Sequence, residues 1–204
     1  MMRCGALVVL LVALVHAKSC PNVKVDQSLD LKRYPGLWYE VASQNLGFLQ
    51  SCKCSVYNFT CTEASCGSFD DHFSCNSDVS KPGSKVDIVL KGKIPDLSVP
   101  AKMEESPIKP WLPSAPYWVL EVGKQYEYAV VYACVGVGGF SSEYIYIFSR
   151  NPSVMPDLDG IKARLKAQGI DYSGIQLIPQ KGCAYPTAGN NPSAVVPFND
   201  TAYY

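Results

Sequence analysis

The cysteine content places the strongest constraint on how this chain can fold. Nine cysteines occur in 204 residues. Residues 1–17 carry Arg3 followed by an apolar run over 6–15, and the small residues at 15 and 17 suit cleavage before Lys18. This pattern predicts a secretory signal peptide, whose removal also removes Cys4. An even number of cysteines in an exported chain predicts disulfides and no free thiol. The remaining cysteines are Cys20, Cys52, Cys54, Cys61, Cys66, Cys75, Cys134 and Cys183.

The length after cleavage suits one domain. About 187 of the 204 residues remain, enough for a sizeable core. We assign residues 18–185 to this domain. Residues 186–204 are rich in Pro, Asn and Ala without periodicity, so they are expected to be a loosely ordered tail.

Charge and hydropathy exclude several classes of partner. Lys+Arg and Asp+Glu both total 18, so no basic field is available to bind nucleic acid. Beyond the signal peptide no apolar run approaches the roughly 20 residues of a membrane span. The sequence therefore predicts a secreted, extracellular protein. The sequons at Asn58 and Asn199 are candidate glycosylation sites.

Short segments with β-type patterns recur between turn residues. Strands are predicted near 37–45, 53–61, 66–75, 84–93, 99–104, 116–122, 126–135 and 143–149. One helix is predicted over Met155–Gln168, with Pro156 in its first turn and Gly169 as its stop, and a last extended piece over Ile175–Ile178. Regular short strands of this kind favour an antiparallel barrel or sandwich.

Four cysteines flank one predicted hairpin. Residues directly opposite in an antiparallel pair share a constant sum of residue numbers, and both Cys61 with Cys66 and Cys52 with Cys75 give 127. One register would therefore place both pairs at a distance that disulfides can span, with a turn over 62–65. Exchange of Cys52 for Cys54 remains an alternative.

Several motifs occur in order along the chain: YPGLWYE at 34–40, WLPSAPYWVL at 111–120, YAVVYAC at 128–134 and IFSRNP at 147–152, with CPNVK at 20–24 and CAY at 183–185. They resemble those of the lipocalin family, in particular its apolipoprotein D-like and bilin-binding branches. The first resembles the family's Gly-x-Trp motif, and the resemblance extends over nearly all of residues 20–185. The family's Thr-Asp-Tyr block is replaced by EVGKQY at 121–126, which predicts a rebuilt turn.

The resemblance implies an all-β fold, an eight-stranded antiparallel up-and-down barrel with one C-terminal α-helix packed outside. It also implies two long-range disulfides, Cys20–Cys134 and Cys54–Cys183, which leave Cys52–Cys75 and Cys61–Cys66 for the hairpin. Gly36, Trp38 and Arg150 take a structural role, with the arginine stacked on the tryptophan across the closed end.

A barrel of this size has room for one small ligand. The function implied is binding and carrying a small hydrophobic molecule, namely a lipid, a sterol, or a pigment such as a bilin or carotenoid. Strand parity makes Tyr146 and Phe148 candidates for lining the calyx, together with Tyr117 or Trp118. The alternative for all four is that they fill a packed core.

Other chemistry has few candidate residues. His72 is the only histidine after the signal peptide, and a solvated turn position is favoured for it over a triad or a metal ligand. We therefore predict no metal site, no catalytic residues and no required cofactor, and leave a homo-oligomer open. Two alternatives are a cysteine-rich defence or inhibitor protein and a prostaglandin-synthase-like enzyme, which needs a free cysteine.

Overall fold

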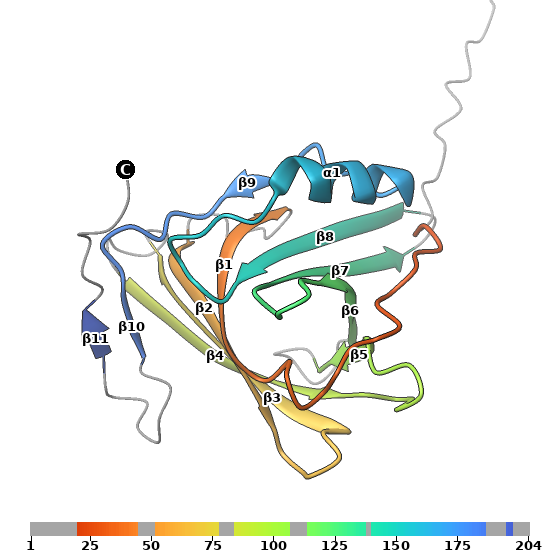
Figure 1. Cartoon of the computed structure of the whole chain (residues 1–204), viewed down its shortest axis with the longest axis horizontal. Coiled ribbons are helices and arrows are strands. Elements are labelled where there is room, and N and C mark those ends of the chain that lie inside the picture. The colour runs from red at the N-terminus through yellow and green to blue at the C-terminus, as the bar shows by residue number, and fades with distance from the viewer. Residues whose placement is uncertain are drawn as a thin grey trace, which may run out of the picture.

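Eight antiparallel strands close into a barrel in the computed structural model, which describes residues 20–44, 52–77, 84–106, 114–137, 140–186 and 195–197 (Figure 1). The predicted fold class is confirmed. The strands are β1 (Gly36–Gln44), β2 (Cys52–Cys61), β3 (Ser68–Ser77), β4 (Ser84–Lys93), β5 (Lys102–Glu105), β6 (Ala115–Val122), β7 (Tyr128–Val137) and β8 (Phe140–Ser149). Each overlaps its predicted counterpart and differs at either end by three residues or fewer.

The barrel closes through β1, which pairs with two neighbours along different parts of its length. Its first half pairs with β2, where Trp38 lies opposite Tyr57. Its second half pairs with β8, and β9 (Gln176–Leu177) lies along its other edge at Ala42 and Ser43. Because consecutive strands are antiparallel neighbours from β2 to β8, the chain winds up and down around one interior.

The helix α1 (Leu158–Ala167) is shorter at its start than predicted. Asp157 caps it, because its carboxylate accepts a hydrogen bond from the Gly160 N–H at 3.0 Å. Pro156 therefore precedes the cap and does not lie in the first turn. Gly169 follows the helix with φ +74°, the conformation that makes glycine a common helix stop.

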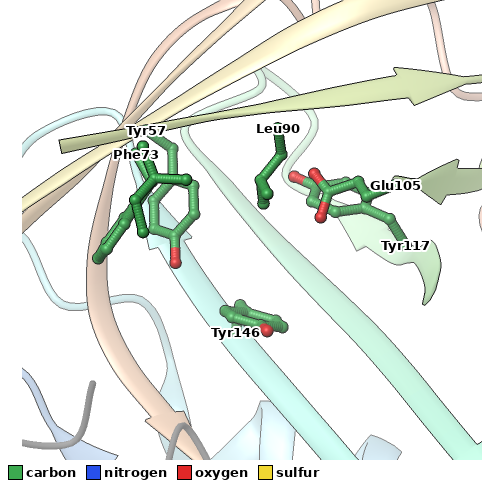
Figure 2. Close-up of a pocket in the computed structure, with 7 residues that line it drawn as sticks. Tyr57, Phe73, Leu90, Glu105, Tyr117 and Tyr146 are labelled. Atoms are coloured by element: carbon green, nitrogen blue, oxygen red, sulfur yellow. The ribbon is translucent and has the colours of Figure 1, made fainter. Parts of the chain in front are cut away.

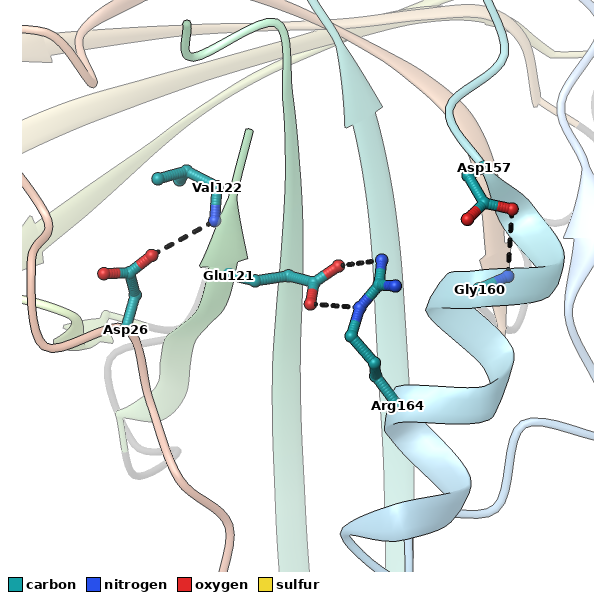
Figure 3. Close-up of polar contacts among 6 residues, drawn as sticks. All are labelled: Asp26, Glu121, Val122, Asp157, Gly160 and Arg164. Carbon is teal, nitrogen blue, oxygen red and sulfur yellow. Dashed lines mark hydrogen bonds and ion pairs between the residues drawn. The ribbon is translucent and has the colours of Figure 1, made fainter. Parts of the chain in front are cut away.

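The helix packs on the outside of the barrel (Figure 1). Ile161 and Leu165 are buried in the same apolar cluster as Ile147, which lies on the outer face of β8. Figure 3 shows Arg164 of α1 bound to Glu121 of β6, with N···O distances of 2.7 and 2.8 Å.

The N-terminal arm is tied to the same strand by Asp26. Its carboxylate accepts from the Val122 N–H at 3.2 Å (Figure 3).

Four disulfides join the chain, in the pairs Cys20–Cys134, Cys52–Cys75, Cys54–Cys183 and Cys61–Cys66. Cys20–Cys134 joins the N-terminal arm to β7, and Cys54–Cys183 joins β2 to the segment before β10. The bridges therefore include both long-range clamps and local links within one hairpin.

The predicted hairpin register is wrong, although the same cysteines are paired. Cys61 lies opposite Phe69 and Cys52 opposite Ser77, and the register shifts between Lys53 and Val56. Cys66 lies in the connecting loop with φ +57° and not in β3. Cys61–Cys66 therefore closes the loop, and Cys52–Cys75 is a diagonal link with Cα atoms 5.6 Å apart.

The tail contains one further strand pair. Val195–Pro197 (β11) pairs antiparallel with Ala184–Pro186 (β10), where loose order was expected. The predicted signal peptide over 1–17 and the sequon at Asn199 lie outside the described residues. In the described part of the chain no helix is long and apolar enough to cross a bilayer.

Candidate functional site

A cavity of about 80 Å³ lies inside the barrel. Most of its lining is aromatic or aliphatic, and one residue is acidic. The lining residues are Tyr57, Phe73, Ile88, Leu90, Glu105, Tyr117 and Tyr146. Figure 2 shows Glu105 beside Tyr117 on one side of this space and Tyr57 with Phe73 on the other.

Strand pairing explains how distant residues meet in this wall. Tyr57 on β2 lies opposite Phe73 on β3, which lies opposite Ile88 on β4. Directly opposite residues of antiparallel strands share a face, so all three side chains project inward. The Tyr57 and Phe73 rings pack with their centroids 4.7 Å apart. Three neighbouring strands thus form one apolar wall.

One carboxyl group, that of Glu105, interrupts the apolar lining, and a second, that of Asp71, is in contact with it. Glu105 lines the cavity, and Asp71 lies opposite Phe59 and Leu90 on the inward face of β3. Burial raises the pKa of Asp71 to about 6, while a hydrogen bond with Glu105 opposes that shift. Burial and the charge of Asp71 raise the pKa of Glu105 well above its usual range. The two groups therefore share a proton near neutral pH.

A third acid, Glu40, is fully buried on β1 opposite Phe148. Burial raises its pKa to about 8. The Ser43 and Ser55 hydroxyls lie near it and oppose this shift, but neither completes a hydrogen bond of normal geometry to the carboxylate. Glu40 therefore holds a proton at neutral pH.

The closed end of the barrel is sealed by Trp38 and Arg150. The guanidinium carbon of Arg150 lies 3.5 Å from the centre of the Trp38 ring. Arg150 donates to the carbonyl oxygens of Arg33, Tyr34, Pro35 and Leu37, at 2.6 to 3.0 Å. Gly36 has φ +102°, and a Cβ there would lie 3.4 Å from the guanidinium, so glycine suits this position on both counts.

Two tyrosines connect this floor to the cavity. The Tyr34 and Tyr117 hydroxyls are hydrogen-bonded at 2.8 Å, and both residues are buried. Tyr34 packs on Trp38, with ring centroids 5.3 Å apart, and its carbonyl accepts from the Trp38 indole N–H at 2.9 Å. The cavity is therefore bounded at this end by a hydrogen-bonded layer.

The four residues predicted to line the calyx occupy different positions in the structure. Tyr117 and Tyr146 line the cavity. Trp118 lies on the outer face, where the Lys102 ammonium sits 5.0 Å from its ring centre, so its assignment to the calyx is corrected. Phe148 faces inward but is fully buried against Trp38 and is not part of the cavity lining.

The acids of the interior were missed because polar residues were interpreted as solvent-exposed. Within the predicted strand 66–75, parity alone puts Asp71 on the same face as Phe69 and Phe73. The prediction that His72 is solvated is confirmed, with 35% of its side chain exposed, but its predicted place in a turn is wrong, since it lies within β3 and its imidazole contacts Asp87 on the outer face. Asn58 is on that outer face too, opposite His72, and is partly exposed.

Among all the described residues, no group of three or more His, Cys, Asp or Glu side chains is placed to hold a metal ion.

Comparisons with known proteins agree with this architecture. Residues 29–180 match the family described as a lipocalin-like domain. The chain is 30% identical to apolipoprotein D of Mus musculus over 170 residues, covering 82% of this chain and 86% of that one. It is also 30% identical to purpurin of Gallus gallus over 185 residues, covering 81% and 89%.

Solved structures share the fold at lower identity. Insecticyanin from the tobacco hornworm Manduca sexta aligns with a TM-score of 0.63 at 21% identity, covering 78% of this chain and 85% of that one. Lobster apocrustacyanin A1 aligns with a TM-score of 0.60 at 19% identity, covering 78% and 89%.

Proposed function

The chain belongs to the lipocalin family, and on that premise we propose that it binds a small, largely apolar ligand in the barrel cavity and carries it. The observation that carries this proposal is the aromatic cavity next to the sealed floor. Burial of apolar ligand surface against these rings supplies the driving force, at roughly 25 cal/mol per Å². Glu105 is the acidic residue in this lining.

The size of the cavity bears on the class of ligand. Sites that enclose whole drug-sized ligands have volumes of roughly 300–1,000 Å³, whereas this cavity has about 80 Å³. It therefore suits a slim ligand, or the narrow end of a longer one. A sterol, bilin or carotenoid would require displacement of lining side chains, of which Tyr146 is partly exposed.

Straight-chain alcohols test cavity binding. We expect calorimetric titration to show affinity rising from 1-butanol to 1-octanol, by about 0.8 kcal/mol per methylene until the space is filled. Leu90→Phe narrows the cavity and should weaken binding of the longer alcohols. Val89→Phe is the matched control, because Val89 is its neighbour on β4, 49% exposed on the outer face. Equal effects of the two substitutions would contradict binding in the cavity.

The pigment alternative has its own test. An absorption spectrum of the protein purified from its natural source would show visible bands if a bilin or carotenoid is bound. A colourless preparation would favour lipids and other small apolar molecules.

The chemistry of the cysteines supports a carrier over an enzyme. All eight cysteines from Cys20 to Cys183 form disulfides, so the described residues offer no thiol for prostaglandin-synthase-like catalysis. Titration of thiols in the unfolded, non-reduced protein should find no stoichiometric free sulfhydryl. The disulfides also support secretion, and Asn58 remains a proposed glycosylation site.

A further inference from the structure

Three of the four oxygens of the Asp71–Glu105 carboxyl pair are buried without a donor from another residue. Neither oxygen of Asp71 has a hydrogen-bond partner beyond the shared proton with Glu105, and the same holds for Oε1 of Glu105. Asp71 is only 1% exposed. Buried polar atoms are normally satisfied, and Glu105 lines the cavity, so its carboxyl group, with Asp71 in contact with it, is placed to accept from a molecule there.

No cation of the described chain reaches the pair. Arg150 is bound to four carbonyl groups at the floor, and Lys162 lies on α1 outside the barrel. His72 follows Asp71 but points to the outer face, toward Asp87. The other described lysines and arginines are exposed. The interior thus holds a negative charge that the described chain leaves uncompensated.

We propose that the ligand carried by this protein is an apolar amine, whose ammonium group is held between Asp71 and Glu105 while its hydrocarbon part lies against the aromatic wall. This inference rests on the proposed carrier function and specifies its ligand class. The pair shares one proton and so carries one negative charge, which a single ammonium neutralises.

Three physical arguments favour an ammonium over other head groups. Hydrogen bonds between ionised partners are roughly twice as strong as neutral ones. The faces of Tyr57, Tyr117 and Tyr146 attract cations. A carboxylate or phosphate head would instead meet like charge in a poorly solvated site.

Three six-carbon compounds that differ only in their head group test the inference. We expect calorimetry at pH 7.5 to show that hexylamine binds about tenfold or more tightly than 1-hexanol, and that hexanoate binds more weakly than both. In Asp71→Asn/Glu105→Gln the preference for hexylamine over 1-hexanol should disappear while 1-hexanol still binds. Circular dichroism in the near ultraviolet would verify the fold.

Two further variants keep the test decisive. Asp71→Asn alone should lower the preference for the amine, because Asp71 is the member of the pair that is ionised at pH 7.5, and it serves if the double variant does not fold. Glu104→Gln is the control, because Glu104 is the adjacent residue on β5 and pairs with Lys93 at 3.3 Å with 40% of its side chain exposed. It should leave all three affinities unchanged.

The outcomes separate the two proposals. Equal affinity for hexylamine and 1-hexanol, or a preference that survives in the double variant, would overturn the amine assignment and leave the carrier function standing. Binding of none of the three compounds, nor of longer alcohols, would overturn both.

Discussion

The closed end of the barrel and the cavity beside it both bury polar side chains, but only the closed end supplies partners for them. Arg150 is stacked on Trp38 and donates to four carbonyl oxygens. In the cavity region Glu40 is buried without a donor, and Asp71 has none beyond the proton that it shares with Glu105. A satisfied polar group stabilises the fold, whereas an unsatisfied one costs stability and is available to a ligand. The closed end therefore stabilises the barrel, and the cavity is suited to binding a ligand.

The first prediction concerns how much Trp38, at the closed end, contributes to the free energy of unfolding. Trp38→Ala should lower the free energy of unfolding by about 3–5 kcal/mol, because a large side chain that is 1% exposed is removed along with the surface on which Arg150 stacks. Urea denaturation followed by circular dichroism measures this loss.

Trp118→Ala is the matched control, since Trp118 lies on the outer face. We expect it to cost about 1 kcal/mol or less. Equal losses for the two tryptophans would contradict the assignment of the floor as the main structural element.

The second prediction concerns the cost of burying Glu40. Its pKa is about 8 in the folded protein against 4.5 when solvated. Between these values unfolding releases this proton, so the stability contributed through Glu40 falls as pH rises from 4.5 to 8. Glu40→Gln should therefore be more stable than the parent by about 2–4 kcal/mol at pH 8 and nearly equal to it at pH 4.5.

Urea denaturation at several pH values gives the comparison. Tyr57 and Tyr146 are near Glu40 but stay protonated throughout this range, because burial raises the pKa of each further above 10. Glu104→Gln, at an exposed glutamate, should leave the pH profile unchanged. A profile in Glu40→Gln that is parallel to that of the parent would show that Glu40 is not held protonated.

The same contrast explains how much could be predicted from the sequence. Alternation located all eight strands. The motifs at 34–40 and 147–152 predicted the closed end of the barrel, because they contain Gly36, Trp38 and Arg150, which lie together there. The register of the β2–β3 hairpin could not be predicted in this way. Cys54 has φ +58° at the register shift, and a bulge of this kind is set by local backbone packing.

The cavity was predicted only in part, for a different reason. Its aromatic residues follow strand parity, but Trp118 and Phe148 show that parity must be combined with the exact bulge positions and with depth in the barrel. The β6–β7 register shifts between Val119 and Glu121. Buried acids such as Asp71 were missed because an isolated acidic residue is usually exposed, and only its place between Phe69 and Phe73 indicates otherwise.

The smallest expected effect lies where the floor and the cavity meet, at the hydrogen bond between Tyr34 and Tyr117. Tyr34→Phe and Tyr117→Phe should each cost about 1 kcal/mol, because each leaves the other hydroxyl without this partner. The double variant should cost no more than either single variant, which gives a coupling energy of about 1 kcal/mol by urea denaturation. A coupling near zero would mean that the Tyr117 hydroxyl does not belong to the sealed floor. It would then join Glu105 as a polar group of the cavity, and the boundary between the two regions would move toward Trp38.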